Sequence, residues 1–373
     1  MLDSMKAFAR RLWTLARRGL GYLWVAIAFP FRAGGGFIAR RGWIVKGSVL
    51  ALLVAVVLFY GLYVWRAEVW HNFNPDYVAG YQLNERSVPA GAPLPTGGGE
   101  AAKVCEDSAI VEVLSGLVDM NVNQNDWLSS TLAYRLGFFG INWDHTLFLD
   151  NKASFQRGVH QAVRRSTVEL VDSLGRVRGT SGVDENLQDA RGNLQYDEYS
   201  WYFGLNPFGF KTPTPSFYRS AIRSLDRFNA ELADCSAVFD ARADNLSQFV
   251  DRIAADLGAT SAILRERSEN HNGGWFDPRA DDRFWFAYGQ LYGYYGILAA
   301  AESDFSQVIA QRDLTALWDE TLVQFRSALD IQPLIISNGR EDGWIMPSHL
   351  ATIGFYILRA RSNLVEVRSV LER

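Results

Sequence analysis

The sequence predicts an all-α protein in which a single N-terminal transmembrane helix precedes a globular domain of six to eight helices. Three observations lead to this fold class. Residues 47–65 contain no charged side chain, helical periodicity dominates from about residue 103 onward, and alternating polar and apolar runs are nearly absent. A chain of 373 residues is long enough to hold both a membrane segment and a sizeable folded core.

Residues 1–42 form a basic leader. Its first part is expected to be an amphipathic helix, because Phe8 and Leu12 share one face while Arg10 lies on the other. Such a helix can lie on a membrane surface, or the leader can be loosely held and serve only to fix topology. The apolar residues 19–31 are too few to span a bilayer comfortably, so an interfacial position is expected for them.

The transmembrane helix is expected at residues 43–66. As a helix, the uncharged stretch would be about 28 Å long, close to the ~30 Å hydrocarbon thickness of a bilayer. Trp43 and Trp65 stand at its two ends, where membrane proteins favour tryptophan. A cleaved signal peptide is the alternative. However, the stretch is longer than a signal-peptide core and is followed by Arg66-Ala67-Glu68 rather than by a small-residue cleavage site.

Charge is divided unequally between the two sides of this helix. The chain has a net charge of −4, but the segment ending at Lys46 carries nine basic residues and one acid, which leaves the rest at −12. Basic flanks are retained on the cytoplasmic side, so the N-terminus is expected inside and the C-terminal domain outside. In a bacterium this means the inner (cytoplasmic) membrane and the periplasm. The lipid bilayer is thus one partner, and the acidic exterior argues against nucleic acid.

The remaining chain is divided by composition into a juxtamembrane region with a Pro/Gly-rich linker, residues 67–102, and an all-helical domain, residues 103–373. The helices of this domain are recognised by apolar residues that recur every three or four positions. Such patterns cover residues 108–118, 126–139, 155–174, 221–239, 246–264, 281–302, 312–329 and 347–371.

Residues 284–301 are weakly polar and long enough to be considered as a second membrane span. Acidic residues bracket the stretch and no cationic side chain follows it closely, so a central, buried helix is expected instead. Gly289, Gly293 and Gly296 fall on one face of that helix. Because each glycine costs about 1 kcal/mol in a helix interior, close packing of another helix is the expected reason for the strip.

Both cysteines follow the predicted membrane span. An oxidising compartment permits a disulfide between Cys105 and Cys235, and closing so long a loop would contribute about 4–5 kcal/mol in the chain-entropy model. The alternative is a free, buried thiol at Cys235, which falls on the apolar face of an expected helix. Spacing alone does not decide between them.

Signatures of common chemistry are missing from the sequence. There is no GxSxG, HExxH, P-loop or dinucleotide-binding pattern, and two cysteines are too few for a zinc or iron–sulfur cage. No cofactor or metal is therefore expected. What remains is a set of segments rich in aromatic and polar residues, namely residues 121–127, 142–145, 199–208 and 270–282.

Four segments, NQNDWLSSTLAYR, FLDNKASFQRGV, WYFGLNPFG and NGGWFDPRADD, carry a resemblance to a known family. Together with the single N-terminal span and the helical exterior domain, they resemble an uncharacterised family of proteobacterial inner-membrane proteins, a domain of unknown function. The resemblance covers most of the chain from Val49 onward. It implies location and architecture, but no activity and no catalytic residues.

The preferred hypothesis is a non-enzymatic module that binds or scaffolds an envelope partner, protein or glycolipid, at the inner membrane. Flat aromatic faces combined with fixed polar groups suit a glycan or a lipid headgroup. The candidate binding residues are Asn125, Asp126, Trp127, Trp143, Trp201, Tyr202, Trp275, Phe276, Asp277 and Arg279.

The alternative hypothesis is a cell-wall glycan hydrolase that uses paired carboxylates. Its candidate catalytic residues are Asp277, Asp281, Asp282 and Glu269. The same acids also suit plain structural roles as helix caps or turn residues. Two carboxylates that face each other across an open aromatic cleft, about 5–10 Å apart, would favour the hydrolase, whereas bonds to amides at a helix start would favour the structural roles.

Overall fold

The computed structural model describes residues 42–86, 88–94, 104–146, 148–176, 182–205 and 208–373. Almost all of the basic leader, including the expected amphipathic helix and the interfacial segment at residues 19–31, lies outside the described residues. The chain divides into two compact units, residues 1–62 and residues 63–373.

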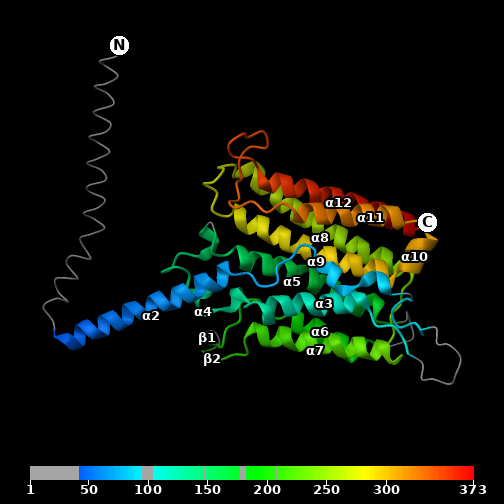
Figure 1. Ribbon diagram of the computed structural model, residues 1–373, viewed down its shortest axis with the longest axis horizontal. Coiled ribbons are helices and arrows are strands. Elements are labelled where there is room, and N and C mark those ends of the chain that lie inside the picture. The colour runs from blue at the N-terminus through cyan, green and yellow to red at the C-terminus, as the bar shows by residue number, and fades with distance from the viewer. Residues whose placement is uncertain (1–41, 87, 95–103, 147, 177–181, 206–207) are drawn as a thin grey trace, which may run out of the picture. The chain divides into compact units, whose positions relative to one another are not determined.

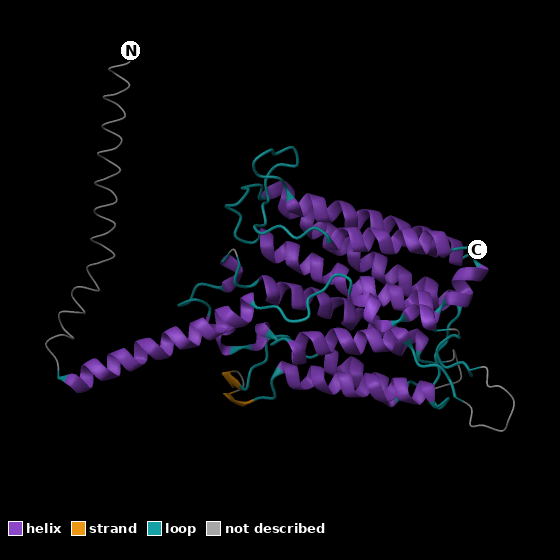
Figure 2. Cartoon of the chain, in the orientation of Figure 1, coloured by secondary structure: helices purple, strands orange, loops and turns teal. Residues whose placement is uncertain are grey.

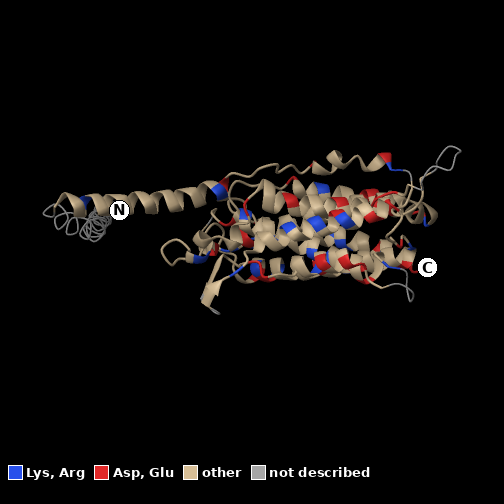
Figure 3. Ribbon diagram, turned by 90° about the horizontal axis from the view of Figure 1, so that it is seen from below, with Lys and Arg blue, Asp and Glu red and all other residues tan. Residues whose placement is uncertain are grey.

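Helix α2 (Trp43–Glu68) contains most of what is described of the first unit and continues into the second. Among the described residues it is the one helix that is long and apolar enough to cross a membrane. Between Lys46 and Arg66 it carries no charged side chain (Figure 3). This confirms the prediction of one apolar N-terminal helix of spanning length.

The second unit is built almost entirely from helices that run side by side (Figures 1 and 2). The described α-helices that follow α2 are α3 (Ala109–Asp119), α4 (Leu132–Leu136), α5 (Asn151–Glu169), α6 (Glu185–Leu194), α7 (Thr214–Ala233), α8 (Ala243–Asn270), α9 (Ala280–Asp304), α10 (Ser306–Gln311), α11 (Thr315–Leu329) and α12 (His349–Leu371). Short π-helical turns, η3 (Met120–Gln124) and η6 (Leu170–Leu174), extend α3 and α5. The all-α fold class is confirmed.

Three elements differ from the helices that periodicity predicted. The expected helix at residues 126–139 is reduced to a 3₁₀ turn and the short α4, which ends at Gly137 where the backbone has a positive φ. Helix α6 was not expected, although Asp184 caps it by accepting a hydrogen bond from the Leu187 amide at 3.0 Å. A small hairpin, β1 (Phe203–Leu205) with β2 (Phe208–Phe210), was also not expected.

Helix α9 is the centre of the unit, and it contacts α3, α5, α8, α11 and α12. Most of its side chains are buried within the unit, so the stretch considered as a second span is a core helix. Gly289 and Gly293 have the expected packing role against α5, whereas Gly296 lies against the side chain of Tyr77. A Cβ added at Gly289 would lie 2.9 Å from the carbonyl carbon of Phe155 in α5, and one at Gly293 would lie 2.8 Å from the Cβ of Ala162.

Residues that follow α2 lie against this helical body, although the sequence suggested a juxtamembrane region and a linker. Tyr77 stacks on Tyr292 with 4.4 Å between ring centroids, and Trp70 contacts Trp285 at 5.1 Å. The Lys152 ammonium donates hydrogen bonds to the carbonyls at the end of α2, Arg66 at 3.0 Å and Val69 at 2.8 Å. The second unit accordingly includes these residues and begins at residue 63.

Cys105 and Cys235 are joined by a disulfide, with their Cα atoms 5.3 Å apart. The expected position of Cys235 on an apolar helical face was wrong. Helix α7 ends at Ala233, and Cys235 follows it in an exposed turn with a φ of 60°. The bond therefore ties the segment before α3 to the end of α7.

Candidate binding pocket

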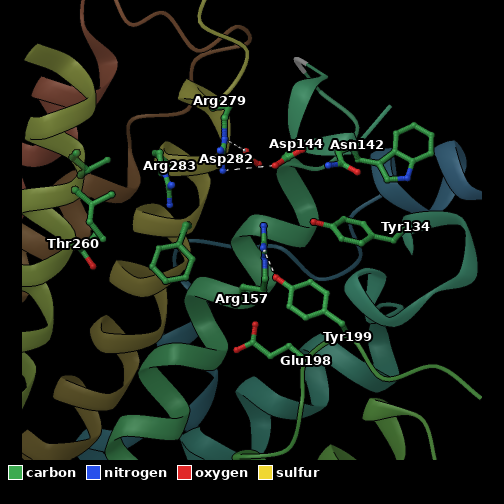
Figure 4. A pocket seen from close by; sticks show the side chains of 14 residues that line it. Tyr134, Asn142, Asp144, Arg157, Glu198, Tyr199, Thr260, Arg279, Asp282 and Arg283 are labelled. Atoms are coloured by element: carbon green, nitrogen blue, oxygen red, sulfur yellow. Dashed lines mark hydrogen bonds and ion pairs between the residues drawn. The ribbon is translucent and has the colours of Figure 1, made fainter. Parts of the chain in front are cut away.

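A pocket of about 430 Å³ opens at the end of the second unit where α5 and α9 begin (Figure 4). Its volume lies within the range of small-molecule binding sites. Charged, aromatic and aliphatic side chains from several segments line it: Tyr134, Asn142, Trp143, Asp144, Arg157, Glu198, Tyr199, Thr260, Ile263, Leu264, Arg279, Asp282, Arg283 and Phe286.

Two of the three arginines in the pocket have partners. Arg157, on α5, donates from Nη1 to the Tyr199 hydroxyl at 2.8 Å and from Nη2 to the Ser154 hydroxyl at 2.9 Å. Arg279, directly before α9, places Nη2 3.6 Å from a carboxylate oxygen of Asp144. These contacts hold both guanidinium groups in place at the pocket wall (Figure 4).

The third arginine, Arg283, is different. It has no hydrogen bond or ion pair with any residue in the part of the chain that the structure describes. Burial lowers the pKa of its guanidinium, and the positive charge of the nearby Arg279 lowers it further. A guanidinium stays charged in proteins, so this shift reports a half-buried positive charge that the nearby Asp282 compensates only in part.

Behind the arginines lies a group of buried acids. Asp282 accepts a hydrogen bond from the Ser154 hydroxyl at 3.0 Å, and Asp150 faces it. Neither oxygen of Asp150 receives an N–H or O–H donor from another described side chain, so a charged Asp150 would gain no hydrogen bond there. Burial and the neighbouring Asp282 raise the pKa of Asp150, and the same two causes raise that of Asp281 to about 8.

Of the ten candidate binding residues, Trp143 and Arg279 line the pocket. The Trp143 indole donates from Nε1 to the Ala133 carbonyl at 2.8 Å and stacks on Tyr63, at 4.5 Å between centroids. Tyr63 belongs to the part of α2 that lies in the second unit, Tyr63–Glu68. The pocket wall is therefore in direct contact with the end of α2.

Three other candidates hold separate segments of the second unit together. Trp127 is buried and donates from Nε1 to the Glu198 carbonyl at 2.8 Å. Asn125 accepts from the His71 amide at 3.0 Å, and Asp126 lies 3.2 Å from Nε of Arg66. Asn125 and Asp126 thus hold the segment after α2 against the body.

The remaining aromatic candidates lie on loops outside the pocket. Trp201 is half-buried, whereas Tyr202, Trp275 and Phe276 are exposed. A single groove lined by all ten candidates therefore does not exist in the structure.

The candidate catalytic acids are also not gathered in one cleft. Asp277 is buried and pairs with Arg267, and it accepts from the Asn338 amide at 2.8 Å, so it fixes a turn. Burial alone would raise its pKa, but these two partners bring the pKa below the usual value. Glu269 forms a surface ion pair with Arg265 at 2.6 Å. Of the four acids, only Asp282 lines the pocket.

Sequence reasoning missed Arg157, Arg283 and Tyr134 as pocket residues. A signal existed for the first. Asp150, Ser154 and Arg157 follow one another at i, i+4 and i+7, which places a polar strip on one face of α5. Nothing comparable marks Arg283, which directly precedes the apolar run of α9. Within the described residues, no group of three His, Cys, Asp or Glu side chains is arranged to hold a metal ion.

Comparison with curated proteins and with solved structures gives no match. A family model described as "Uncharacterized protein conserved in bacteria (DUF2333)" matches residues 128–272 and 265–373, which together are more than half of the chain. All residues that line the pocket fall within the matched ranges. The chain therefore belongs to this family of uncharacterized proteins conserved in bacteria.

Proposed function

We propose that this protein is a tethered binding module of the proteobacterial inner membrane, with its helical body in the periplasm. The module binds an anionic group of an envelope partner in the pocket. The inside position of the N-terminus is supported by the nine basic residues up to Lys46, and the periplasmic position of the body by the disulfide between Cys105 and Cys235.

The observation that carries the proposal is the unpartnered Arg283 in a pocket that already contains Arg157 and Arg279. An unmatched buried charge is costly, so a site that retains one is ready for a ligand of the opposite sign. Guanidinium groups bind phosphate and carboxylate through paired N–H donors. The pocket is also lined by Asp144, Glu198 and Asp282, so the opening for an anion is specific to Arg283, which no described side chain pairs with.

A glycolipid headgroup suits this pocket better than a protein partner. The volume of about 430 Å³ accommodates one or two sugar or phosphate groups rather than a protein surface. Tyr134 and Tyr199 add aromatic faces, and Asn142 adds an amide that can bind hydroxyl groups. The contact of Trp143 with Tyr63 also keeps the pocket close to the end of the apolar helix, where lipid headgroups are found.

The test compares anionic lipids that remain bound to the full-length protein after gentle extraction from native membranes, measured by native mass spectrometry. The test variant is Arg283→Gln, and the matched control is Arg265→Gln, which removes an exposed arginine outside the pocket. Loss of one guanidinium–phosphate contact should weaken binding by about 10- to 100-fold, since such bonds contribute roughly 1.5–3 kcal/mol. The control should retain the wild-type lipid.

Equal lipid retention in wild type and both variants would refute the pocket assignment. If Arg283→Gln instead released a co-purifying protein, the envelope partner would be a protein. A reporter enzyme fused after Arg373 tests the topology, because activity in the cytosol would contradict a periplasmic body.

The glycan hydrolase remains the second candidate on one observation. Asp282 lines the pocket beside the buried Asp150, whose pKa is raised by burial and by Asp282, and a carboxylic acid that stays protonated in this way is what general acid catalysis requires. Purified full-length protein incubated with isolated cell-wall glycan should release new reducing ends if this alternative is correct, and Asp282→Asn should abolish the release. No release from wild-type protein would count against it.

A further inference from the structure

Four loops of the second unit present large apolar side chains to solvent. These tip loops are residues 137–149, the β1–β2 hairpin at residues 203–210, residues 271–279 and residues 331–348. Six of their side chains are 69–94 % exposed: Phe139, Phe208, Phe210, Phe276, Leu334 and Trp344. No large apolar side chain elsewhere in the described part of this unit is as exposed.

The tip loops lie together at one end of the helical body, away from the C-terminus (Figures 1 and 3). Direct contacts join three of them. Gly274 and Asn338 exchange backbone hydrogen bonds of 2.9 and 3.2 Å, and Arg279 lies 3.6 Å from Asp144. Tyr199, which precedes the hairpin, bonds to Arg157 in the pocket wall. Three of the tip loops are thus joined to one another, and the segment before the hairpin reaches the pocket wall.

The same end receives the segment of α2 that belongs to this unit. Tyr63 stacks on Trp143, and Trp143 is part of the first tip loop, four residues after Phe139. Tyr63 is only two residues from Trp65, where the uncharged stretch of α2 ends. The covalent chain thus leads from the tip loops directly into the apolar helix.

We propose that the tip loops rest on the lipid bilayer and insert their apolar side chains into its headgroup region. The surface of a soluble protein rarely has so many exposed aromatic side chains in one region. Proteins that lie at a membrane interface, in contrast, insert Phe, Trp and Leu side chains into the headgroup region. The bilayer is the occupant favoured here because the chain joins this end of the body to a helix of membrane-spanning composition. Docking would turn the mouth of the pocket toward the lipid headgroups. The proposal goes beyond ligand binding and holds whether or not the pocket is occupied.

The experiment measures the membrane depth of fluorophores attached to single cysteines in the full-length protein. Phe210→Cys, Phe276→Cys and Trp344→Cys place a label on three different tip loops, and Gln311→Cys places one on the exposed last residue of α10, which lies at the opposite end (Figure 1). The native cysteines do not react because they form a disulfide. One copy is reconstituted per nanodisc of phosphatidylethanolamine and phosphatidylglycerol, with or without lipids that carry a nitroxide near the headgroup.

The three tip labels should lose most of their fluorescence when nitroxide lipids are present, and the Gln311 label should keep it. The double substitution Leu334→Asp and Phe208→Asp should reduce the quenching of the label at position 276, with the circular dichroism spectrum unchanged. Equal fluorescence of tip and control labels in the two kinds of nanodisc would overturn the proposal. So would tip labels that become shielded only when two copies share a nanodisc, since a second copy would then be the occupant.

Discussion

Replacing Gly289 by alanine tests whether the contact between α5 and α9 depends on a missing side chain. The added Cβ would lie 2.9 Å from the carbonyl carbon of Phe155 and 3.0 Å from its Cα, where ordinary contact begins at 3.4 Å. Both atoms belong to the backbone of a packed helix, so no change of side-chain rotamer can relieve the contact. The carbonyl oxygen of Phe155 lies closer still, so the two helices would have to separate by more than about 0.5 Å.

The expected change in stability is the sum of two opposing effects. Alanine is favoured over glycine in a helix by about 1 kcal/mol. Overpacking of a close helix contact costs about 3 kcal/mol, because a gap of half an ångström already forfeits a quarter of the dispersion energy across it. We therefore expect Gly289→Ala to lower the free energy of unfolding by about 2 kcal/mol, which corresponds to a drop of a few degrees in Tm.

The assay is denaturant unfolding of the full-length protein in detergent, followed by circular dichroism. Gly354→Ala is the matched control. It also lies in a helix, α12, and is buried, but a Cβ added there would meet nothing within 4 Å. It should stabilise the protein by up to about 1 kcal/mol. A Gly289→Ala variant as stable as the Gly354→Ala variant would show that backbone proximity at α9 is not what the glycine provides.

Three further predictions concern charge and crosslinking. Burial raises the pKa of Asp281 to about 8 from its usual 3.8, so the folded state holds this proton while the unfolded chain releases it. Stability should therefore fall as pH rises from about 4 to 8, by at most about 6 kcal/mol, and Asp281→Asn should flatten this dependence of the denaturation midpoint on pH. Replacing both Cys105 and Cys235 by serine should cost about 4–5 kcal/mol in unfolding free energy, whereas a reductant should then have no further effect. Lys152→Met removes the hydrogen bonds to the Arg66 and Val69 carbonyls, so amide hydrogen exchange should accelerate at residues 63–73 and stay unchanged in α12.

The central helix could be predicted because its signals are local. The apolar period of α9, its bracketing acids and the spacing of Gly289, Gly293 and Gly296 all lie within one stretch of sequence. The same reasoning failed at α6, where a capping Asp184 was present but the apolar face is short. Local patterns thus identify elements that bury a long face, and miss those that bury little.

The pocket could not be predicted because its members come together only through tertiary packing. Arg157 and Arg283 are separated by 126 positions in the sequence and lie on different helices. Conversely, several aromatic and polar residues that cluster in the sequence have a structural role, because they hold one segment of the body against another. Trp127 and Asp277 each satisfy a buried polar partner next to a turn. A cluster of such residues in the sequence therefore fits two roles equally well, namely holding a turn against the core and binding a ligand.

The signs of the charges around the pocket distinguish structural roles from a binding role. Asp282 lies in the first turn of α9, where the helix dipole stabilises negative charge, and the neighbouring Asp281 accepts hydrogen bonds from backbone amides at the start of the same helix. The acids therefore have a reason to be there that requires no ligand.

Arg283 has no such reason. It lies one turn into α9, where the dipole disfavours a positive charge, and it has no ion pair among the described residues. Two helix N-termini, those of α5 and α9, also direct their positive ends toward this region. Because Arg283 is half-buried and has no hydrogen bond to a described residue, an anion bound near the two helix starts would stabilise it, which is the binding role proposed above for the pocket.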